Sequence, residues 1–253
     1  MRIFGIVIGF FLLCGFFLFA SAMYKDFLTE QMKFERVRTA VKDKQEIIEK
    51  LLREHEIATD NVHLLLVVTK DNDCIDVYAK TKHQTSYQKI HSYKICSRSG
   101  HLGPKRKQGD GQVPEGFYYI DRFNPVSNFY LSMGINYPNQ SDKRKSSYPD
   151  PGGDIFIHGS CVTIGCLPIT DDSIKELYLL AVYAKNNGQD RIPVYIFPFR
   201  MTDQQILNYY AEYKGNDALL SFWKNLKTGF DLFMKEQKEL NIKVNANGDY
   251  SYH

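Results

Sequence analysis

Residues 155–168 read IFIHGSCVTIGCLP and hold the most informative pattern in this 253-residue chain. An apolar run with the character of a buried strand ends at His158, and Cys161 and Cys166 follow within eight residues. Gly159 and Gly165 separate these side chains and allow tight backbone geometry. The combination is compatible with a metal site, a disulfide, or a cysteine nucleophile beside its base.

The metal and disulfide interpretations account for few of these residues. His158, Cys161 and Cys166 have the spacing H-x2-C-x4-C, whereas structural zinc sites usually bring a second pair of ligands. The other histidines are scattered, and we predict neither a metal nor an organic cofactor. A disulfide between Cys161 and Cys166 would close only a small ring. Two buried thiols beside a buried histidine remain the simplest structural alternative.

The nucleophile interpretation accounts for more of the stretch. A strand end holds the imidazole of His158 in place, and Gly159 lets the following loop bend away. Gly165 permits close backbone approach, so that an amide N–H beside Cys166 can face a developing oxyanion. A helix is expected to begin near Thr170. Its N-terminus and the imidazole would both favour the thiolate of Cys166.

The stretch HGSCVTIGC (158–166) resembles the catalytic signature of the YkuD-type L,D-transpeptidase domain, which pairs His-Gly with a later Ser/Thr, glycine and cysteine. Upstream, GDGQVPEGFYYID (109–121) resembles the family's Thr-Pro-x-Gly-x-Phe segment, with Val113 in place of threonine. The resemblance covers roughly residues 60–200 and is strongest with the YafK-like branch. Three features depart from the family pattern: only four residues separate His158 from Thr163, Ile164 replaces His or Arg, and Leu167-Pro168 replaces an apolar residue followed by Asn or Arg.

The resemblance implies acyl transfer on peptidoglycan stem peptides. Cys166 would attack the carbonyl of a diamino acid, with His158 as general base and a backbone carbonyl of Gly159 or Ser160 orienting the imidazole. Amides around Gly165 would stabilise the oxyanion. The acyl-enzyme would pass to an amine, from a stem-peptide diamino acid or a protein lysine, or to water. L,D-carboxypeptidase and amidase activities are therefore alternatives.

A second alternative belongs to a different class of protein. The chain would then be a membrane-tethered wall-binding module without activity, whose helical flanks serve as interaction surfaces. An unreactive Cys166, or a disulfide joining it to Cys161, would favour this alternative.

The N-terminus predicts export. An uncharged apolar run extends from Ile3 to Met23, and Ala20-Ser21-Ala22 resembles a cleavage site, so residues 1–22 form a signal peptide or a membrane anchor. Lipidation at Cys14 is a weaker alternative because Leu13 fits that signal poorly. The rest of the chain is expected in the periplasm or cell envelope, an oxidising environment in which a free thiol needs a function.

The remaining patterns predict three further parts. Residues 23–58 have helical periodicity and form a stalk or pack on the domain. Residues 59–200 form a predominantly β catalytic domain with one inserted helix at 171–188. The resemblance implies a β-sandwich or barrel of the L,D-transpeptidase type, and with its helical flanks the chain is α+β overall. Residues 201–253 form a helical extension, with segments at 203–213 and 216–240.

The net charge of +3 does not indicate a nucleic-acid partner. The basic stretch 98–107 is either a solvated loop or a surface for an anionic substrate.

Overall fold

A computed structural model of the chain describes residues 27–253. The predicted signal peptide or anchor at 1–22, and the lipidation alternative at Cys14, lie outside these residues. Among the helices that are described, none combines the length and apolarity needed to cross a membrane.

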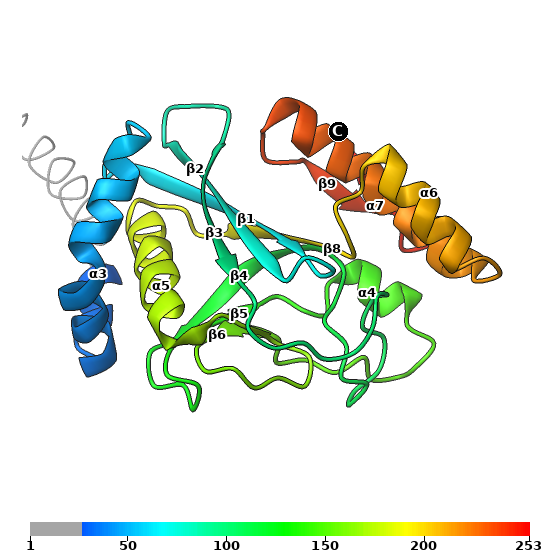
Figure 1. Cartoon of the computed structure of the whole chain (residues 1–253), viewed down its shortest axis with the longest axis horizontal. Helices are drawn as coiled ribbons and strands as arrows, with labels where there is room; N and C mark the ends of the chain where they lie inside the picture. The colour runs from blue at the N-terminus through cyan, green and yellow to red at the C-terminus, as the bar shows by residue number, and fades with distance from the viewer. Residues whose placement is uncertain (1–26) are drawn as a thin grey trace, which may run out of the picture.

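The helices and strands follow one another along the chain as shown in Figure 1. The helices are α2 (Phe27–Gln31), α3 (Glu35–Glu54), α4 (Gln140–Lys145), α5 (Thr170–Asn186), α6 (Asp203–Glu212) and α7 (Asp217–Glu236). The strands are β1 (Val62–Thr69), β2 (Cys74–Thr81), β3 (Gln88–Lys94), β4 (Gly116–Asn124), β5 (Ser132–Ile135), β6 (Phe156–His158), β7 (Leu167–Pro168), β8 (Ile192–Phe197), β9 (Ile242–Val244) and β10 (Tyr250–Tyr252).

Eight strands form one mixed sheet in the order β3-β2-β1-β8-β4-β5-β6-β7. The pairs β1–β8 and β6–β7 are parallel, and the others are antiparallel. The predicted β domain with a late inserted helix is confirmed, since α5 lies between β7 and β8. A second, short helix within this domain, α4, was not predicted.

The sheet buries both of its faces, as the sequence of β1 illustrates. Because side chains alternate along a strand, Leu64, Leu66 and Val68 enter one core, while Leu65 and Val67 enter the other. Helices α3 and α5 lie over the first face, and α7 covers the second with a cluster of aromatic side chains. This two-sided burial explains why β1 is almost continuously apolar.

The N-terminal helix packs on the domain rather than projecting as a stalk. Four apolar side chains of α3 are buried against the core: Val37, Ala40, Ile48 and Leu52. The ammonium group of Lys44 donates to the carboxylates of Asp172, 2.6 Å away, and Glu176, 2.8 Å away, so an ion-pair cluster joins α3 to α5. The helix predicted over 23–58 is broken at residues 32–34, between α2 and α3.

The C-terminal part contains the two expected helices and also an unexpected hairpin. Strands β9 and β10 pair around the turn that holds Asn247-Gly248. Asn-Gly between alternating residues is a hairpin signal that could have revealed these strands. The hairpin packs against the aromatic core, where Tyr250 is buried next to Phe117.

Candidate active site

The end of the sheet brings His158 and Cys166 to one cleft. Strand β6 ends at His158, and the parallel β7 begins directly after Cys166. The register places His158 opposite Pro168 and Ile157 opposite Leu167. Both side chains line a cleft of about 650 Å³. Cys161 therefore lies within the connection from β6 to β7, and Cys166 is the last residue of that connection.

His158 is held in one orientation by its neighbours. It is 1% exposed, and its Nδ1 atom lies 2.5 Å from the carbonyl oxygen of Gly159. Because a carbonyl only accepts, Nδ1 carries the proton and Nε2 remains free to accept one. The ring of Phe129 lies against the imidazole, with centroids 4.6 Å apart. Burial lowers the pKa of His158, so the neutral form required of a base is favoured near neutral pH.

Cys166 is a free, half-buried thiol. Its surroundings favour the neutral thiol over the thiolate that was expected from the sequence. Burial raises the pKa of Cys166 and Asp154 adds to this shift, while a hydrogen bond from the backbone of Phe156 and the charge of Lys105 oppose it. Helix α5 begins at Thr170, four residues after Cys166, so its N-terminal dipole does not outweigh the effect of burial on the pKa of Cys166. These influences together favour the neutral thiol, which needs a base to become a nucleophile.

The backbone amides that were expected to form the oxyanion hole are already hydrogen-bonded to the hydroxyl of Thr163. Its hydroxyl oxygen accepts from the N–H of Cys166 at 2.8 Å and from that of Gly165 at 3.2 Å. The same hydroxyl donates to the carbonyl of Cys166 at 2.9 Å. These amides can donate to an oxyanion only if their hydrogen bonds to the Thr163 hydroxyl are broken. The sequence did not indicate this requirement.

Gly159 is required for close packing rather than for a bend. A Cβ atom there would lie 2.6 Å from a carboxylate oxygen of Asp171 and 2.7 Å from the carbonyl oxygen of Phe129. Of the two residues considered as the partner of His158, Gly159 makes the hydrogen bond and Ser160 does not. The N–H of Ser160 instead donates to Asp171 at 2.7 Å, which fixes the loop to the start of α5.

A disulfide between Cys96 and Cys161 corrects the cysteine pairing considered from the sequence. It joins the chain just after β3 to the loop between His158 and Cys166. A pairing of Cys161 with Cys166 is excluded, and Cys161 is no longer available as a thiolate metal ligand. Among residues 27–253, no group of three or more His, Cys, Asp or Glu side chains has the arrangement of a metal site.

The segment that resembles the family's upstream motif supports the cysteine loop. The carbonyl oxygen of Gln112 lies 3.0 Å from where a Cβ atom of Gly165 would stand, and Gly165 has φ +134°. Glu115 is fully buried and pairs with Lys70 at 2.9 Å. Its other oxygen accepts from the indole of Trp223 at 2.9 Å, so helix α7 also anchors this segment.

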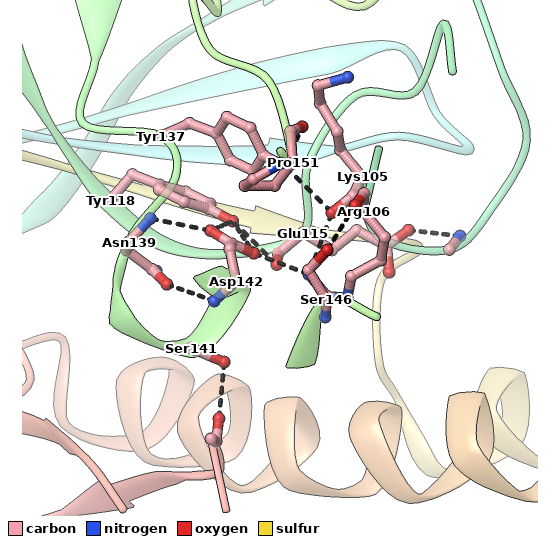
Figure 2. A network of polar contacts seen from close by, with 12 residues as sticks. Lys105, Arg106, Glu115, Tyr118, Tyr137, Asn139, Ser141, Asp142, Ser146 and Pro151 are labelled. Atoms are coloured by element: carbon pink, nitrogen blue, oxygen red, sulfur yellow. Dashed lines mark hydrogen bonds and ion pairs between the residues drawn. The ribbon is translucent and has the colours of Figure 1, made fainter. Parts of the chain in front are cut away.

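A buried polar network around Asp142 connects residues 105–106 and Tyr118 to α4 (Figure 2). The carboxylate accepts from Arg106 at 2.8 Å, from the hydroxyl of Tyr118 at 3.0 Å and from the backbone of Asn139 at 3.1 Å. Burial raises the pKa of Asp142 to about 6 even though Arg106 opposes the shift. The network is structural and joins residues 105–106 to α4.

The basic stretch 98–107 is largely committed to such internal pairs. Arg98 pairs with Asp73, Lys105 with Asp110 at 2.7 Å, and Arg106 with Asp142. These pairs hold the loop in shape, so its positive charge is mostly neutralised. These contacts favour the interpretation of the stretch as a loop over that of a surface for an anionic substrate.

Several functional neighbours were not evident from the sequence. Phe129, Cys96 and Asp171 are far from His158 along the chain and reach the site only through the fold. Large apolar side chains also stand exposed at the rim of the cleft: Phe129 at 41%, Val162 at 57% and Ile164 at 88%. The exposed Ile164 occupies the position where the family pattern has a polar side chain.

Comparison with known proteins defines the class. The model of the YkuD L,D-transpeptidase catalytic domain matches residues 65–196, within the domain predicted at 59–200, and the chain belongs to this family. It is 38% identical over 186 residues to the candidate L,D-transpeptidase YafK of Escherichia coli (strain K12), covering 72% of this chain and 71% of that protein. The resemblance to the YafK-like branch is thereby confirmed.

Two solved structures are more distant. The helical cell shape determining protein Pgp2 from Campylobacter jejuni has 20% identity and a TM-score of 0.42, covering 73% of this chain and 74% of that one. Bdellovibrio bacteriovorus Bd1075 has 22% identity and a TM-score of 0.39, covering 72% and 75%.

Proposed function

We propose that this protein catalyses cysteine-dependent acyl transfer on peptidoglycan stem peptides, with Cys166 as nucleophile and His158 as general base. The observation that carries the proposal is the orientation of His158 by the carbonyl of Gly159, in a cleft that it shares with a free thiol. Membership of the L,D-transpeptidase family supplies the substrate class.

The reaction proceeds by two acyl transfers. The sulfur of Cys166 bonds to the carbonyl carbon of a diamino acid while its proton passes to Nε2 of His158. The C–N bond to the following residue breaks, and the imidazolium returns the proton to the departing amine. An incoming amine then gives its proton to His158 as it attacks the thioester, and the thiol is restored. Water in place of the amine gives the carboxypeptidase or amidase reaction.

The lowered pKa of His158 and the raised pKa of Cys166 both fit an attack that is assisted by a base. A histidine with a lowered pKa is neutral and able to accept, and a thiol with a raised pKa stays protonated until substrate arrives. This arrangement differs from a resting thiolate–imidazolium pair. It places the proton transfer in the same step as the attack.

The oxyanion would draw on the backbone around Gly165. In this proposal the Thr163 hydroxyl rotates away from the two N–H groups as the tetrahedral intermediate forms. Each amide then exchanges a neutral acceptor for a charged one, which makes a stronger hydrogen bond.

We infer an extracytoplasmic location, in the periplasm or cell envelope. The Cys96–Cys161 disulfide supports it, because such bonds persist in oxidising compartments. The apolar residues before Met23 support it independently, and attachment to the membrane through them is part of this proposal.

The assignment is tested with tetrapeptide muropeptides, with and without an amine acceptor, and analysis of product masses. Cross-linked products are expected from a transpeptidase, tripeptides from a carboxypeptidase. Cys166→Ala should abolish turnover, whereas Cys74→Ala, at the other free cysteine within residues 27–253, should retain it. A carbapenem should add its mass to the wild-type thiol and not to Cys166→Ala. An active Cys166→Ala enzyme would refute Cys166 as the nucleophile. A wild-type protein that neither converts the muropeptides nor reacts with the carbapenem would instead favour the non-catalytic wall-binding alternative.

A further inference from the structure

Cys166 borders a second cleft, which His158 does not line. This cleft, of about 450 Å³, lies between the β1–β2 turn, the chain after β3 and helix α6. Tyr209, Glu212 and Tyr213 of α6 form one side of it, and these residues lie beyond the segment matched by the family model. The C-terminal extension therefore contributes directly to the surroundings of the nucleophile.

The position of His158 assigns the two clefts to different parts of a substrate. The base must reach the amine that leaves or enters, so the amine side of the scissile bond belongs in the cleft that His158 lines. The carbonyl carbon bonds to Cys166. The rest of the acyl chain then extends into the second cleft. This assignment rests on the function proposed above.

The acidic and basic residues that line the second cleft are Lys70, Asp71, Asp73, Arg98, His101 and Glu212, so carboxylates outnumber lysine and arginine side chains. The cations are already committed, because Lys70 contacts Glu115 at 2.9 Å and two carbonyl oxygens, and Arg98 pairs with Asp73 and donates to the backbone carbonyl of Asp71. The carboxylates of Asp71 and Glu212 have no ion-pair partner among the described residues. Burial raises the pKa of Tyr209 to about 12, and the charges of Asp71 and Glu212 add to this shift.

Asp71 and Ser99 have unused hydrogen-bonding capacity in this cleft. Oδ2 of Asp71 accepts from the hydroxyl of Tyr209 at 3.1 Å, whereas its buried Oδ1 has no partner among the described residues. The buried hydroxyl of Ser99 likewise has none within residues 27–253. Buried polar atoms are normally satisfied, and an unpaired carboxylate oxygen is best satisfied by a cationic donor.

We propose that this cleft is a subsite for an ammonium group on the side chain of the acyl residue, bound by Asp71 and supported by Glu212 and Ser99. The free amine of a diamino acid has this chemistry. Tyr209 holds Asp71 in place from α6, where it stacks on Phe199 with ring centroids 4.0 Å apart. Selectivity for the acyl residue would then depend on a helix outside the segment that the family model matches.

The test compares two tetrapeptides that differ only in the side-chain amine, with diaminopimelate or 2-aminopimelate at the third position. The wild-type enzyme should prefer the diaminopimelate peptide by roughly 10-fold or more in kcat/KM, mainly through KM, as expected for one charged hydrogen bond. Asp71→Asn should bring the ratio towards one, and Glu212→Gln, at an exposed site, should lower it partially. Asp60→Asn, an exposed aspartate at the opposite end of β1, is the matched control and should leave the ratio unchanged.

The outcomes separate this inference from the proposed function. Equal turnover of both peptides by the wild type, or an equal loss on both in Asp71→Asn, would overturn the subsite while leaving the acyl transfer intact. Absence of turnover for both peptides, together with failure of a carbapenem to acylate Cys166, would overturn both. Thermal unfolding of each variant checks that the fold is retained.

Discussion

Nδ1 of His158 lies 2.5 Å from the carbonyl oxygen of Gly159, and this contact leaves Nε2 as the only ring nitrogen able to accept a proton. The imidazole is also buried and packs against the tilted ring of Phe129. An imidazole held in this way can act as the proposed base only if it is neutral, if Phe129 keeps it in place and if the loop that carries the thiol is fixed beside it.

The pH dependence of kcat/KM should reflect a neutral base and a neutral thiol. His158 must be unprotonated, and because its pKa is lowered, activity should fall only as the pH drops through a midpoint below about 6.5. Cys166 has a raised pKa, so its alkylation by iodoacetamide should still be increasing at pH 9. Alkylation that is already at its maximum at pH 7 would instead indicate a preformed ion pair.

Phe129→Ala should lower kcat by roughly 3- to 10-fold, the range expected for loss of one aromatic contact. The imidazole would keep its hydrogen bond to Gly159 but gain rotational freedom. Steady-state kinetics with a tetrapeptide measure the effect. Val126→Ala, a neighbouring exposed apolar residue at 67% exposure that does not line the cleft, is the control. Equal losses in both variants would contradict a specific role for Phe129.

Gly165→Ala should reduce activity about 10-fold or more. Its φ of +134° is unfavourable for a residue with a Cβ atom, and that atom would be pressed against the carbonyl of Gln112. The thiol and its amide would therefore move relative to His158. Gly153→Ala is the matched control because its Cβ atom would meet nothing within 4 Å. Wild-type kinetics for Gly165→Ala would show that this backbone position is not critical.

Removal of the disulfide should destabilise the protein by about 2–4 kcal/mol, the usual range for a bond that closes a long loop. Cys96 and Cys161 are 65 residues apart, and their bond fixes the loop that precedes Cys166. The double variant Cys96→Ser/Cys161→Ser should unfold at lower denaturant concentration and respond no further to dithiothreitol. Cys74→Ser, which changes a cysteine outside the disulfide, should unfold like the wild type. An unchanged midpoint in the double variant would contradict the prediction.

Local patterns in the sequence predicted much of the fold. The patterns over 59–200 predicted a predominantly β domain, and the helix expected at 171–188 corresponds to α5. The hairpin after α7 was missed because its strands have only three residues each, too few for a pattern to emerge despite the Asn-Gly signal. The break at 32–34 was missed because no glycine or proline marks it.

The local motif was enough to single out His158 and Cys166 as the candidates for the chemistry. How these two side chains are held could not be predicted from that motif. Cys96, Phe129 and the second cleft reach the site from distant parts of the chain. The sequence left open whether the carbonyl of Gly159 or that of Ser160 accepts from His158, and the direction of the backbone in the structure shows that it is Gly159. Short-range patterns encode the elements, whereas contacts between elements depend on the path of the whole chain, and those contacts set the pKa values and pairing of the site.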